Sequence, residues 1–494
     1  MAAVGEYKQC LRGDVESDMV PEATTTSSVG VELSGLDDSK QDQEQEQPVA
    51  AEQSSPLLAD WRSAPEVRSL EEFSGSVPLP PTTAQTWRKA AAWCGPGLLV
   101  SVGYMDPGNW STDIAGGSAF GYRLLFIVTL SSGMAMFLQS LALKVGLATQ
   151  RDLAQCCRDA YSRPVCLVLW VICETAIMAT DLAEVIGSAV ALKLLLNIPL
   201  VAGVCITSLD VLLFLALRGL SIKIVELVVG ALILLITVCF AIQLNLLSPS
   251  AIDVFSGFLP SHEIVADPDC LFVAVGIIGA TVMPHNLFLH SSLVLTRAVN
   301  RSDEVAIKQA HSYAFADSTI SLLYAWFVNA AILMVAAAAF YEHGNKEVAT
   351  LEDAYTLLTP VLGTTAGSTL FAVALLASGQ NATLTGTLTG QIVMEGFTTF
   401  RVSPMTRRTV TRLLAIVPAV LAIAIGGDGS ANYLRIVSQV SLSFALPFAI
   451  FPLVHISSSR EKMGAAMVNP VWMTALAYLI GGLIVSLNIL IFAV

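Results

Sequence analysis

Two short polar motifs stand inside long apolar stretches of this sequence. The first runs Gly103-Tyr-Met-Asp-Pro-Gly-Asn109, and the second runs Gly279-Ala-Thr-Val-Met-Pro-His-Asn286. Each motif contains a proline, which removes a backbone hydrogen-bond donor and clashes with the preceding turn of a helix. Gly108 relaxes the first motif further, because glycine adopts backbone conformations that other residues avoid. We therefore expect the chain to unwind at both motifs.

The donor atoms at these motifs indicate a class of ligand. Asp106 supplies a carboxylate, Asn109 an amide oxygen and Met283 a thioether, and unwinding would free backbone carbonyls near Gly103 and Ala280. Hard alkaline-earth ions take oxygen ligands, whereas a thioether is a soft ligand. The mixed set therefore favours Mn²⁺, Fe²⁺, Co²⁺ or Cd²⁺ over Mg²⁺ and Ca²⁺.

The elements that position both motifs must be membrane helices. Of the 494 residues, 54% are hydrophobic and 13% are charged, whereas about 25% are charged in an average globular protein. A helix that spans a bilayer needs ~20 predominantly apolar residues. The sequence contains eleven such segments, at about 92–118, 122–147, 164–192, 199–217, 221–246, 270–297, 312–341, 366–396, 410–426, 431–455 and 470–493.

The two motifs occupy equivalent places in the order of these segments. They fall in the first and sixth segments, which begin two consecutive groups of five at about 92–246 and 270–456. An odd number of spans per group turns the second group upside down relative to the first, and 470–493 is an extra helix. Paired broken helices in inverted repeats are typical of transporters whose substrate binds between the repeats. We expect an all-α membrane protein with 86–494 as its transport domain.

Charge sets the expected orientation of the chain. With the N-terminus in the cytoplasm, the inner connections contain seventeen Lys and Arg residues and the outer connections contain four, as the positive-inside rule requires. Eleven spans then place the C-terminus outside. The stretch 1–85 contains 16 acidic and 5 basic residues without apolar periodicity. We expect it to be a disordered acidic cytoplasmic tail, to which sorting or regulatory proteins could bind.

A row of acids in the third segment suggests a route for protons. Glu174, Asp181 and Glu184 are spaced i, i+7 and i+10, so they lie on one face of a helix. Acids inside a membrane are costly and mark ion or proton paths, and a carboxyl group removed from water binds a proton more readily. His285 follows the second motif and titrates near neutral pH, so it can connect Asp106 with this row.

Three motifs in order carry a family resemblance. They are Asp106-Pro-Gly-Asn109, then Met283-Pro-His-Asn286 followed by Leu-Phe-Leu-His290-Ser, and finally Gly379-Gln-Asn-Ala-Thr-Leu-Thr-Gly-Thr-Leu-Thr-Gly-Gln-Ile-Val-Met-Glu-Gly396. Together they resemble the natural resistance-associated macrophage protein (NRAMP) family of proton-coupled divalent metal transporters, and the third is similar to the transport motif in that family's eighth helix. The resemblance covers roughly residues 87–494 and excludes the tail.

The resemblance implies a LeuT-like fold and a set of site residues. The implied metal ligands are Asp106, Asn109, Met283 and the carbonyl of Ala280, joined in one conformation by Gln439, which matches a tenth-helix glutamine of some members by position. The third-helix acids and Arg412, which matches a ninth-helix arginine, would form the proton route. His290 is interpreted as a packing or hydrogen-bonding histidine.

We expect a secondary transporter that moves Mn²⁺ or Fe²⁺, together with Cd²⁺ and Co²⁺, into the cytoplasm with protons. The sequence has no nucleotide-binding loop, so ATP cannot drive transport directly, and it has no His-Glu-x-x-His motif of a metalloprotease. We expect no enzymatic activity, no cofactor and no nucleic acid as partner. Two alternatives stay open: a carrier of an organic substrate with the same fold, against which the carboxylate of Asp106 argues, and a non-transporting metal sensor. The sequence fits the plasma membrane and an endosomal or vacuolar membrane equally.

Other residues with chemical potential have no part in this scheme. The nine cysteines lie in or beside apolar segments or singly in the tail, without paired spacing, and we interpret them as structural thiols. Asp210 and Asp317 are two further intramembrane acids to which the sequence assigns no role.

Overall fold

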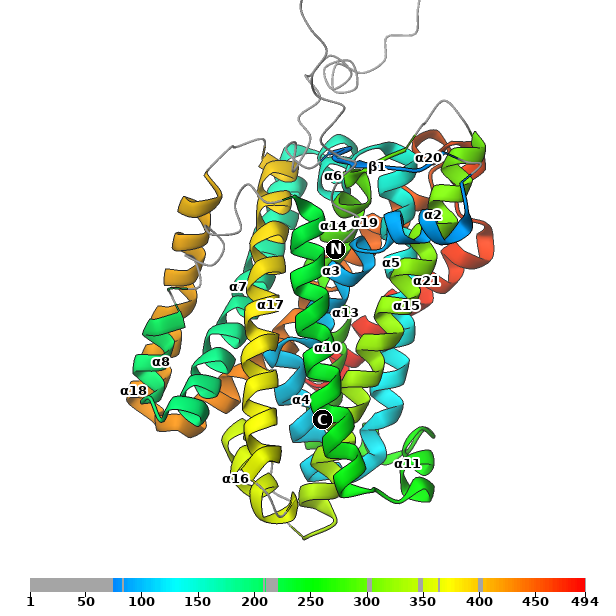
Figure 1. Ribbon diagram of the computed structural model, residues 1–494. Helices are drawn as coiled ribbons and strands as arrows, with labels where there is room; N and C mark the ends of the chain where they lie inside the picture. Colours follow the sequence, from blue (N-terminus) through cyan, green and yellow to red (C-terminus); the bar gives the residue numbers. More distant parts are fainter. Residues whose placement is uncertain are drawn as a thin grey trace, which may run out of the picture. The chain divides into compact units, whose positions relative to one another are not determined.

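A chain that crosses hydrocarbon must satisfy its backbone polar groups internally, and a helix does this within one segment. The computed structural model describes residues 74–81, 84–207, 209, 221–299, 304–344, 350–362, 365–398 and 403–493, and these residues are mainly helical (Figure 1). The expectation of a disordered tail at 1–85 falls almost entirely outside the described residues. Asp210 also lies outside them.

All eleven expected segments coincide with described helices. The first and sixth are each divided in two, and the fourth is described only in its first half. The spans are α3 (Pro96–Val102) with α4 (Pro107–Phe120), α5 (Leu125–Thr149), α7 (Arg163–Leu196), α8 (Leu200–Thr207), α10 (Ile222–Leu247), α13 (Pro268–Val282) with α14 (Pro284–Leu293), α15 (Glu304–Ala336), α17 (Thr365–Thr398), α18 (Pro404–Ala445) with α19 (Pro447–Ser458), and α21 (Val471–Leu490).

Within the described residues, eight helical stretches are individually long and apolar enough to cross a membrane. The three remaining segments have local explanations: the first is divided by its break, the fourth is incompletely described, and the eighth is rich in Thr, Gly and Ser. The chain is thus an integral membrane protein that crosses the bilayer several times.

Short elements connect these spans. The parallel strands β1 (Val77–Pro78) and β2 (Arg297–Ala298) pair with Val77 opposite Arg297, so the chain before the first span is joined to the end of the sixth. The remaining elements are α2 (Thr86–Trp93), η1 (Gly103–Met105), η2 (Gly121–Leu124), α6 (Leu153–Ala160), α11 (Ala251–Gly257), α12 (Glu263–Ala266), η3 (Val294–Thr296), η4 (Ala337–Tyr341), α16 (Leu351–Leu362) and α20 (Arg460–Met467).

The expected first segment, 92–118, is wrong at its start. Helix α2 ends at Trp93, and Gly95 follows with a φ of 146°, which residues with a side chain rarely adopt. The membrane helix begins anew at Pro96, because proline is suited to the first position of a helix, where no backbone donor is needed. Residues 86–93 therefore form a separate helix.

The expected ninth and tenth segments, 410–426 and 431–455, correspond to the spans Thr409–Gly427 and Gly429–Ser458. Both belong to α18, which is kinked at Gly427, where φ is 72°. The tenth segment, expected at 431–455, is divided again, since α18 ends at Ala445 and α19 begins at Pro447. Proline lacks the donor that would continue the helix. The backbone nevertheless stays helical at Leu446, with φ −55° and ψ −46°, so the tenth span is not unwound there as the first and sixth are at their breaks.

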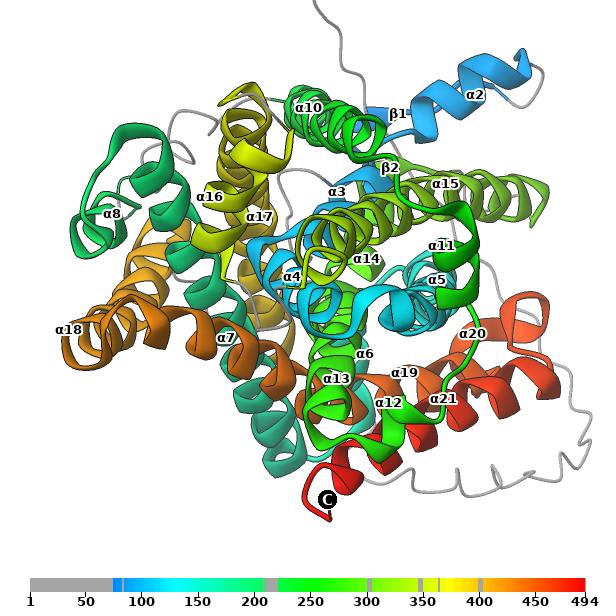
Figure 2. The same ribbon diagram turned by 90° about the horizontal axis from the view of Figure 1, so that it is seen from below.

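The two broken spans lie in the interior of the helical domain. In Figure 2, α4 lies among α5, α7, α15 and α17, and α13 packs against α18, α5 and α4. In the most apolar part of the sixth span 94% of the residues are buried, compared with 28% in α21. The sixth span is therefore shielded from lipid, whereas α21 is peripheral.

Candidate metal site

The break in the first span positions Asp106. After η1 the backbone becomes extended at Asp106, with φ −74° and ψ 166°, and the helix resumes at Pro107. Asp106 is the N-cap of α4, and its Oδ1 accepts a hydrogen bond from the backbone N–H of Asn109 at 2.8 Å. Its Oδ2 has no hydrogen-bond partner among the described residues, although the side chain is fully buried. One carboxylate oxygen is therefore available to a ligand.

Two backbone carbonyls freed by this break are already occupied. Asn329 of α15 donates to the Tyr104 carbonyl at 2.8 Å, and the Met105 carbonyl accepts from the indole N–H of Trp110 and from the hydroxyl of Ser378. Side chains of the seventh and eighth spans thus fix the unwound backbone. Such pairing is what makes unwound backbone tolerable at membrane depth.

The break in the sixth span occurs at Met283. Its φ is 36° and its ψ is 110°, so it ends α13 and precedes α14. A positive φ is uncommon for residues with a side chain and often marks a functional position. Met283 is fully buried, and Ala280 is buried inside the last turn of α13.

Asn286 shows that the two breaks are adjacent. Its Nδ2 donates to the sulfur of Met283 at 3.7 Å. A β-carbon at Gly103 would lie 2.1 Å from the same Nδ2, so the backbone of the first break approaches this amide closely. The sequence motif contains Asn286, yet sequence reasoning gave it no role. The sequence feature that could have indicated a role for Asn286 is its position in the first turn of α14, directly after the interruption of the helix at Met283.

Gln439 of α18 lies against both breaks. A β-carbon at Gly108 would lie 2.2 Å from the Gln439 Nε2, and one at Gly279 would lie 2.1 Å from the Gln439 carbonyl oxygen. Both glycines are therefore required for the close approach of α18. The Gln439 Oε1 has no hydrogen-bond partner within the described part of the chain.

Three buried acceptor oxygens near the breaks therefore have no donor in the described structure: Asp106 Oδ2, Asn109 Oδ1 and Gln439 Oε1. Most buried polar atoms in proteins have a partner, and leaving one unsatisfied costs about 1–3 kcal/mol. A cation satisfies several such oxygens at once. No group of three His, Cys, Asp or Glu residues that could bind a metal occurs in the described ranges, so this donor set differs from that of a permanent zinc site.

The acids of the third span face two arginines of α18. Glu174 accepts from Arg407 Nη2 at 2.7 Å and from the indole of Trp170 at 3.1 Å. Further along α7, Asp181 and Glu184 lie 4.0 and 3.8 Å from Arg412 Nη1. The expected row thus lies on one face of α7, and each member is beside a guanidinium group.

His285 lies next to this row. It is 4% exposed, and its Nδ1 has no partner among the described residues. Asp181 is the charged group that acts on it. His285 therefore follows the break at Met283 by two residues and lies near Asp181 of α7.

Sequence reasoning missed Arg407 and Thr383. Arg407 and Arg412 are five residues apart, which is about 140° around a helix, so their spacing did not indicate a shared neighbour. Thr383 of α17 accepts from Arg412 Nη2 and donates to Glu184 at 3.4 Å. Thr383 reaches these two groups because α17 packs on α7, and this packing has no local signal in the sequence.

His290 has the hydrogen-bonding role that the sequence suggested. Its Nδ1 lies 2.9 Å from Gln139 Oε1, and Gln139 Nε2 donates to the Tyr104 hydroxyl at 2.8 Å. All three side chains are buried. This chain of hydrogen bonds connects the second half of the sixth span with the unwound part of the first.

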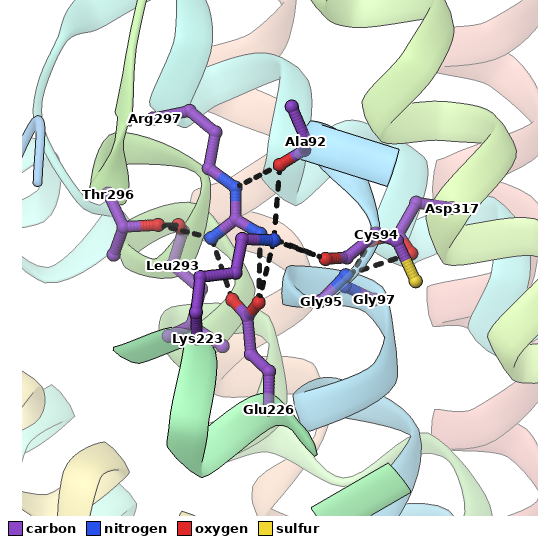
Figure 3. A network of polar contacts seen from close by, with 10 residues as sticks. All are labelled: Ala92, Cys94, Gly95, Gly97, Lys223, Glu226, Leu293, Thr296, Arg297 and Asp317. Atoms are coloured by element: carbon purple, nitrogen blue, oxygen red, sulfur yellow. Dashed lines mark hydrogen bonds and ion pairs between the residues drawn. The ribbon is translucent and has the colours of Figure 1, made fainter. Parts of the chain in front are cut away.

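A second polar network, here called the inner network, consists of Lys223, Glu226, Arg297 and Asp317 (Figure 3). Arg297 is buried and forms a bidentate pair with Glu226, at 2.7 and 3.2 Å. Its remaining N–H groups reach Thr296 and the carbonyls of Ala92 and Cys94 at 2.9–3.2 Å. All five guanidinium donors are thus satisfied.

The inner network fastens the start of α3. Lys223 donates to the carbonyls of Ala92 and Cys94 at 3.2 and 2.7 Å. Asp317 accepts from the backbone N–H groups of Gly95 and Gly97 at 3.2 and 2.7 Å, which gives this acid a structural position that its sequence context did not indicate. Glu226 is likewise an intramembrane acid that sequence reasoning overlooked.

The cysteines of α6 behave as structural thiols. Cys156 and Cys157 are buried in this short helix between two spans. Burial raises the pKa of Cys156 from 9 to about 12 and also raises that of Cys157. A higher pKa leaves less of the reactive thiolate at any given pH.

Alkylation should therefore distinguish buried thiols from exposed ones. At pH 8 we expect Cys156 in the folded protein to react with iodoacetamide roughly a thousandfold more slowly than in urea, because its thiolate fraction falls by about that factor. Cys94 has an exposed side chain, but partial burial also raises the pKa of its thiol, so it should slow less than Cys156 and serves as the internal comparison. Peptide mass spectrometry measures both rates, and equal rates for Cys156 in the two conditions would contradict the burial of α6.

The sequence matches the family model described as natural resistance-associated macrophage protein-like over residues 97–493. The divalent metal cation transporter MntH of Bradyrhizobium diazoefficiens is 51% identical over 436 residues, which cover 88% of this chain and 96% of the relative. MntH of Listeria welshimeri is 52% identical over 429 residues, which cover 87% and 95%.

Solved structures agree with the fold. A manganese transporter of Eremococcus coleocola, in complex with an aromatic bis-isothiourea compound, matches with a TM-score of 0.79 and 41% identity, over 85% of this chain and 90% of that one. MhsT in complex with L-phenylalanine matches with a TM-score of 0.50 and 15% identity, over 81% and 97%, and it supports the fold alone. The expected LeuT-like class is confirmed.

Proposed function

Because the chain belongs to the natural resistance-associated macrophage protein family, we propose that it transports divalent transition metal ions across a membrane in symport with protons. The proposed substrates are Mn²⁺ and Fe²⁺, with Cd²⁺ and Co²⁺ as further ions of suitable chemistry. Relatives that are 51% and 52% identical bear the name divalent metal cation transporter, and a solved structure that is 41% identical is of a manganese transporter.

The observation that carries this proposal is the set of buried acceptors without donors at the two breaks. Among the described residues, Asp106, Asn109 and Gln439 each supply an oxygen without a donor, and the Met283 sulfur accepts from an amide N–H at 3.7 Å. A carboxylate, two amide oxygens and a thioether suit a borderline divalent metal. An organic substrate bound by its carboxylate would instead meet the charge of Asp106.

Burial of the ligands requires alternating access. Asp106, Asn109 and Met283 are at most 1% exposed, so an ion reaches them only if helices move. The inner network fastens α3 to α10 and α15, and we propose that it keeps the cytoplasmic side closed until the ion is bound. Opening that side would release α3 and let the metal enter the cytoplasm.

Proton coupling is proposed from the row on α7. His285 follows the break at Met283 by two residues, and Glu174, Asp181 and Glu184 lie beside Arg407 and Arg412. A dication that binds beside Asp106 disfavours a proton on that carboxylate and on His285. The proton released is passed along α7 toward the side that we assign to the cytoplasm from the distribution of Lys and Arg.

Uptake into proteoliposomes tests the function directly. The full chain is reconstituted, and ⁵⁴Mn²⁺ uptake is measured with an inward pH gradient, without one, and with a protonophore. We expect the gradient to accelerate uptake and the lumen to acidify as metal enters. Metal uptake that neither responds to the gradient nor moves protons would refute symport, and an absence of uptake under all conditions would refute transport.

The proton route makes a separate prediction. Asp181→Asn and His285→Ala should weaken the dependence of uptake on external pH more than they weaken Mn²⁺ binding, since neither side chain is a proposed ligand. The measurements are uptake from pH 5.5 to 7.5 and Mn²⁺ affinity by calorimetry. Gln243→Ala, which removes a buried polar side chain of α10, is the control. Wild-type pH profiles in both variants would remove α7 from the mechanism.

A further inference from the structure

A cavity of about 550 Å³ lies beside α3, outside the metal site. It is enclosed by α2 and α3 on one side and by α10 and α15 on the others, and these helices pack on one another in the structure. Its lining is mostly apolar and includes Leu98, Gly230, Ile233 and Ala316. Cavities that bind small molecules have volumes of about 300–1,000 Å³, so this one can accommodate part of an apolar ligand.

The cavity opens to the lipid-facing surface. Leu234 of α10 and Ile320 of α15 also line it, and they are 59% and 68% exposed. Both residues belong to helices that span the membrane. The molecules that reach such an opening are the acyl chains of the bilayer, which identifies the apolar part of the occupant.

The helix at one end of the cavity, α2, carries basic residues next to those that line it. Ala90 and Ala91 of α2 line this end, and the same short helix presents Trp87 and Arg88, both exposed, and partly exposed Lys89. Arg88 lies 5.4 Å from the ring centroid of Trp87. Tryptophan beside basic residues is typical of the membrane interface, and basic clusters on the cytoplasmic side bind anionic lipid headgroups.

We propose that this cavity is a binding site for an anionic phospholipid. One acyl chain fills the space between α3, α10 and α15, and the phosphate lies against Arg88 and Lys89 of α2. Charge complementarity selects an anionic headgroup, and the opening between Leu234 and Ile320 admits the chain from the inner leaflet.

The bound lipid would act on the movement of α3. Cys94 and Asp317 line the cavity and also belong to the contacts of the inner network, through the Cys94 carbonyl and the Asp317 carboxylate. An acyl chain against Leu98 restrains the helix that must move when the cytoplasmic side opens. This consequence rests on the proposed function, whereas lipid binding itself does not.

Native mass spectrometry tests the binding. The purified full-length protein is mixed with palmitoyl-oleoyl phosphatidylglycerol or phosphatidylcholine, without any metal, and the bound fractions are compared. We expect the anionic lipid to bind roughly 30-fold more tightly, since each of the two basic residues near the headgroup contributes roughly fivefold. Ala316→Trp fills the cavity and should abolish retention of both lipids. Ala475→Trp, the same change at an exposed alanine of α21, should bind like wild type.

The headgroup position is tested by Arg88→Gln with Lys89→Gln. This double variant should bind the two lipids equally, while Arg460→Gln with Lys462→Gln, which removes two charges from α20, should keep the preference. Wild-type lipid binding by Ala316→Trp, with its thermal stability unchanged, would overturn the proposed site. An unchanged preference in the α2 double variant would overturn the headgroup assignment. Mn²⁺ uptake measured in parallel reports separately on transport.

Discussion

Asp106→Asn is expected to fold, insert and lose Mn²⁺ uptake by roughly a hundredfold or more, because unit charges about 4 Å apart interact by several kcal/mol at the effective dielectric of a protein. The carboxylate of Asp106 is the charged group that we place on the metal. Its Oδ2 is the oxygen without a partner among the described residues, and its burial excludes water that could replace it.

The fold should survive this substitution. Asp106 caps α4 through Oδ1, and asparagine is an equally good N-cap residue. Asp152→Asn is a matched control, since Asp152 is also fully buried and caps α6 by accepting from Gln155 at 2.9 Å. Uptake and Mn²⁺ affinity are measured in proteoliposomes, with circular dichroism to verify folding. Near-normal uptake by a well-folded Asp106→Asn protein would eliminate this residue as a ligand.

The sequence predicted the membrane spans and two of their interruptions for physical reasons. Apolar length is a direct requirement of the bilayer, so each of the eleven segments contains a described helix. Proline with glycine and polar residues at membrane depth identified the breaks at Asp106 and Met283. In both cases the proline begins the second half-helix, where its missing donor has no cost. It therefore marks the residue before it as the unwound one.

The remaining features depend on which helices meet. Gln439 approaches Gly108 and Gly279 only because α18 packs on α4 and α13, and the resemblance to a family, rather than a local pattern, indicated it. The pairing of Arg407 with Glu174 joins residues 233 positions apart. Periodicity along one helix shows which residues share a face, but it does not identify the neighbour of that face.

The division of the tenth span between α18 and α19 could not be predicted from apolar length. An apolar segment with Gly427 near its start and Pro447 in its interior satisfies the length rule as a single helix. Whether a proline bends, interrupts or merely begins a helix depends on the packing around the freed carbonyls. At the first break Asn329 and Ser378 satisfy those carbonyls, and such partners come from distant parts of the sequence.

Selectivity among metals should depend on Met283, the only soft ligand proposed for the site. Met283→Ala leaves carboxylate, amide and carbonyl oxygens, an environment that Ca²⁺ and Mg²⁺ also accept. We expect Mn²⁺ uptake to persist and to become sensitive to competition by Ca²⁺. Cd²⁺ is softer than Mn²⁺, so its affinity should fall more, by roughly tenfold if the sulfur contact contributes about 1.4 kcal/mol.

The experiment must distinguish loss of the sulfur ligand from damage to the fold, because Met283 is buried and has a positive φ. Met134→Ala removes a buried methionine of α5 and controls for the cavity that truncation leaves. Mn²⁺ uptake is measured against excess Ca²⁺ or Mg²⁺, with Cd²⁺ affinity in parallel. A uniform decrease for every ion would indicate structural damage. If the variant excludes Ca²⁺ and binds Cd²⁺ as wild type does, sulfur is not a ligand, and the preference for transition metals must come from the oxygen donors and the size of the site.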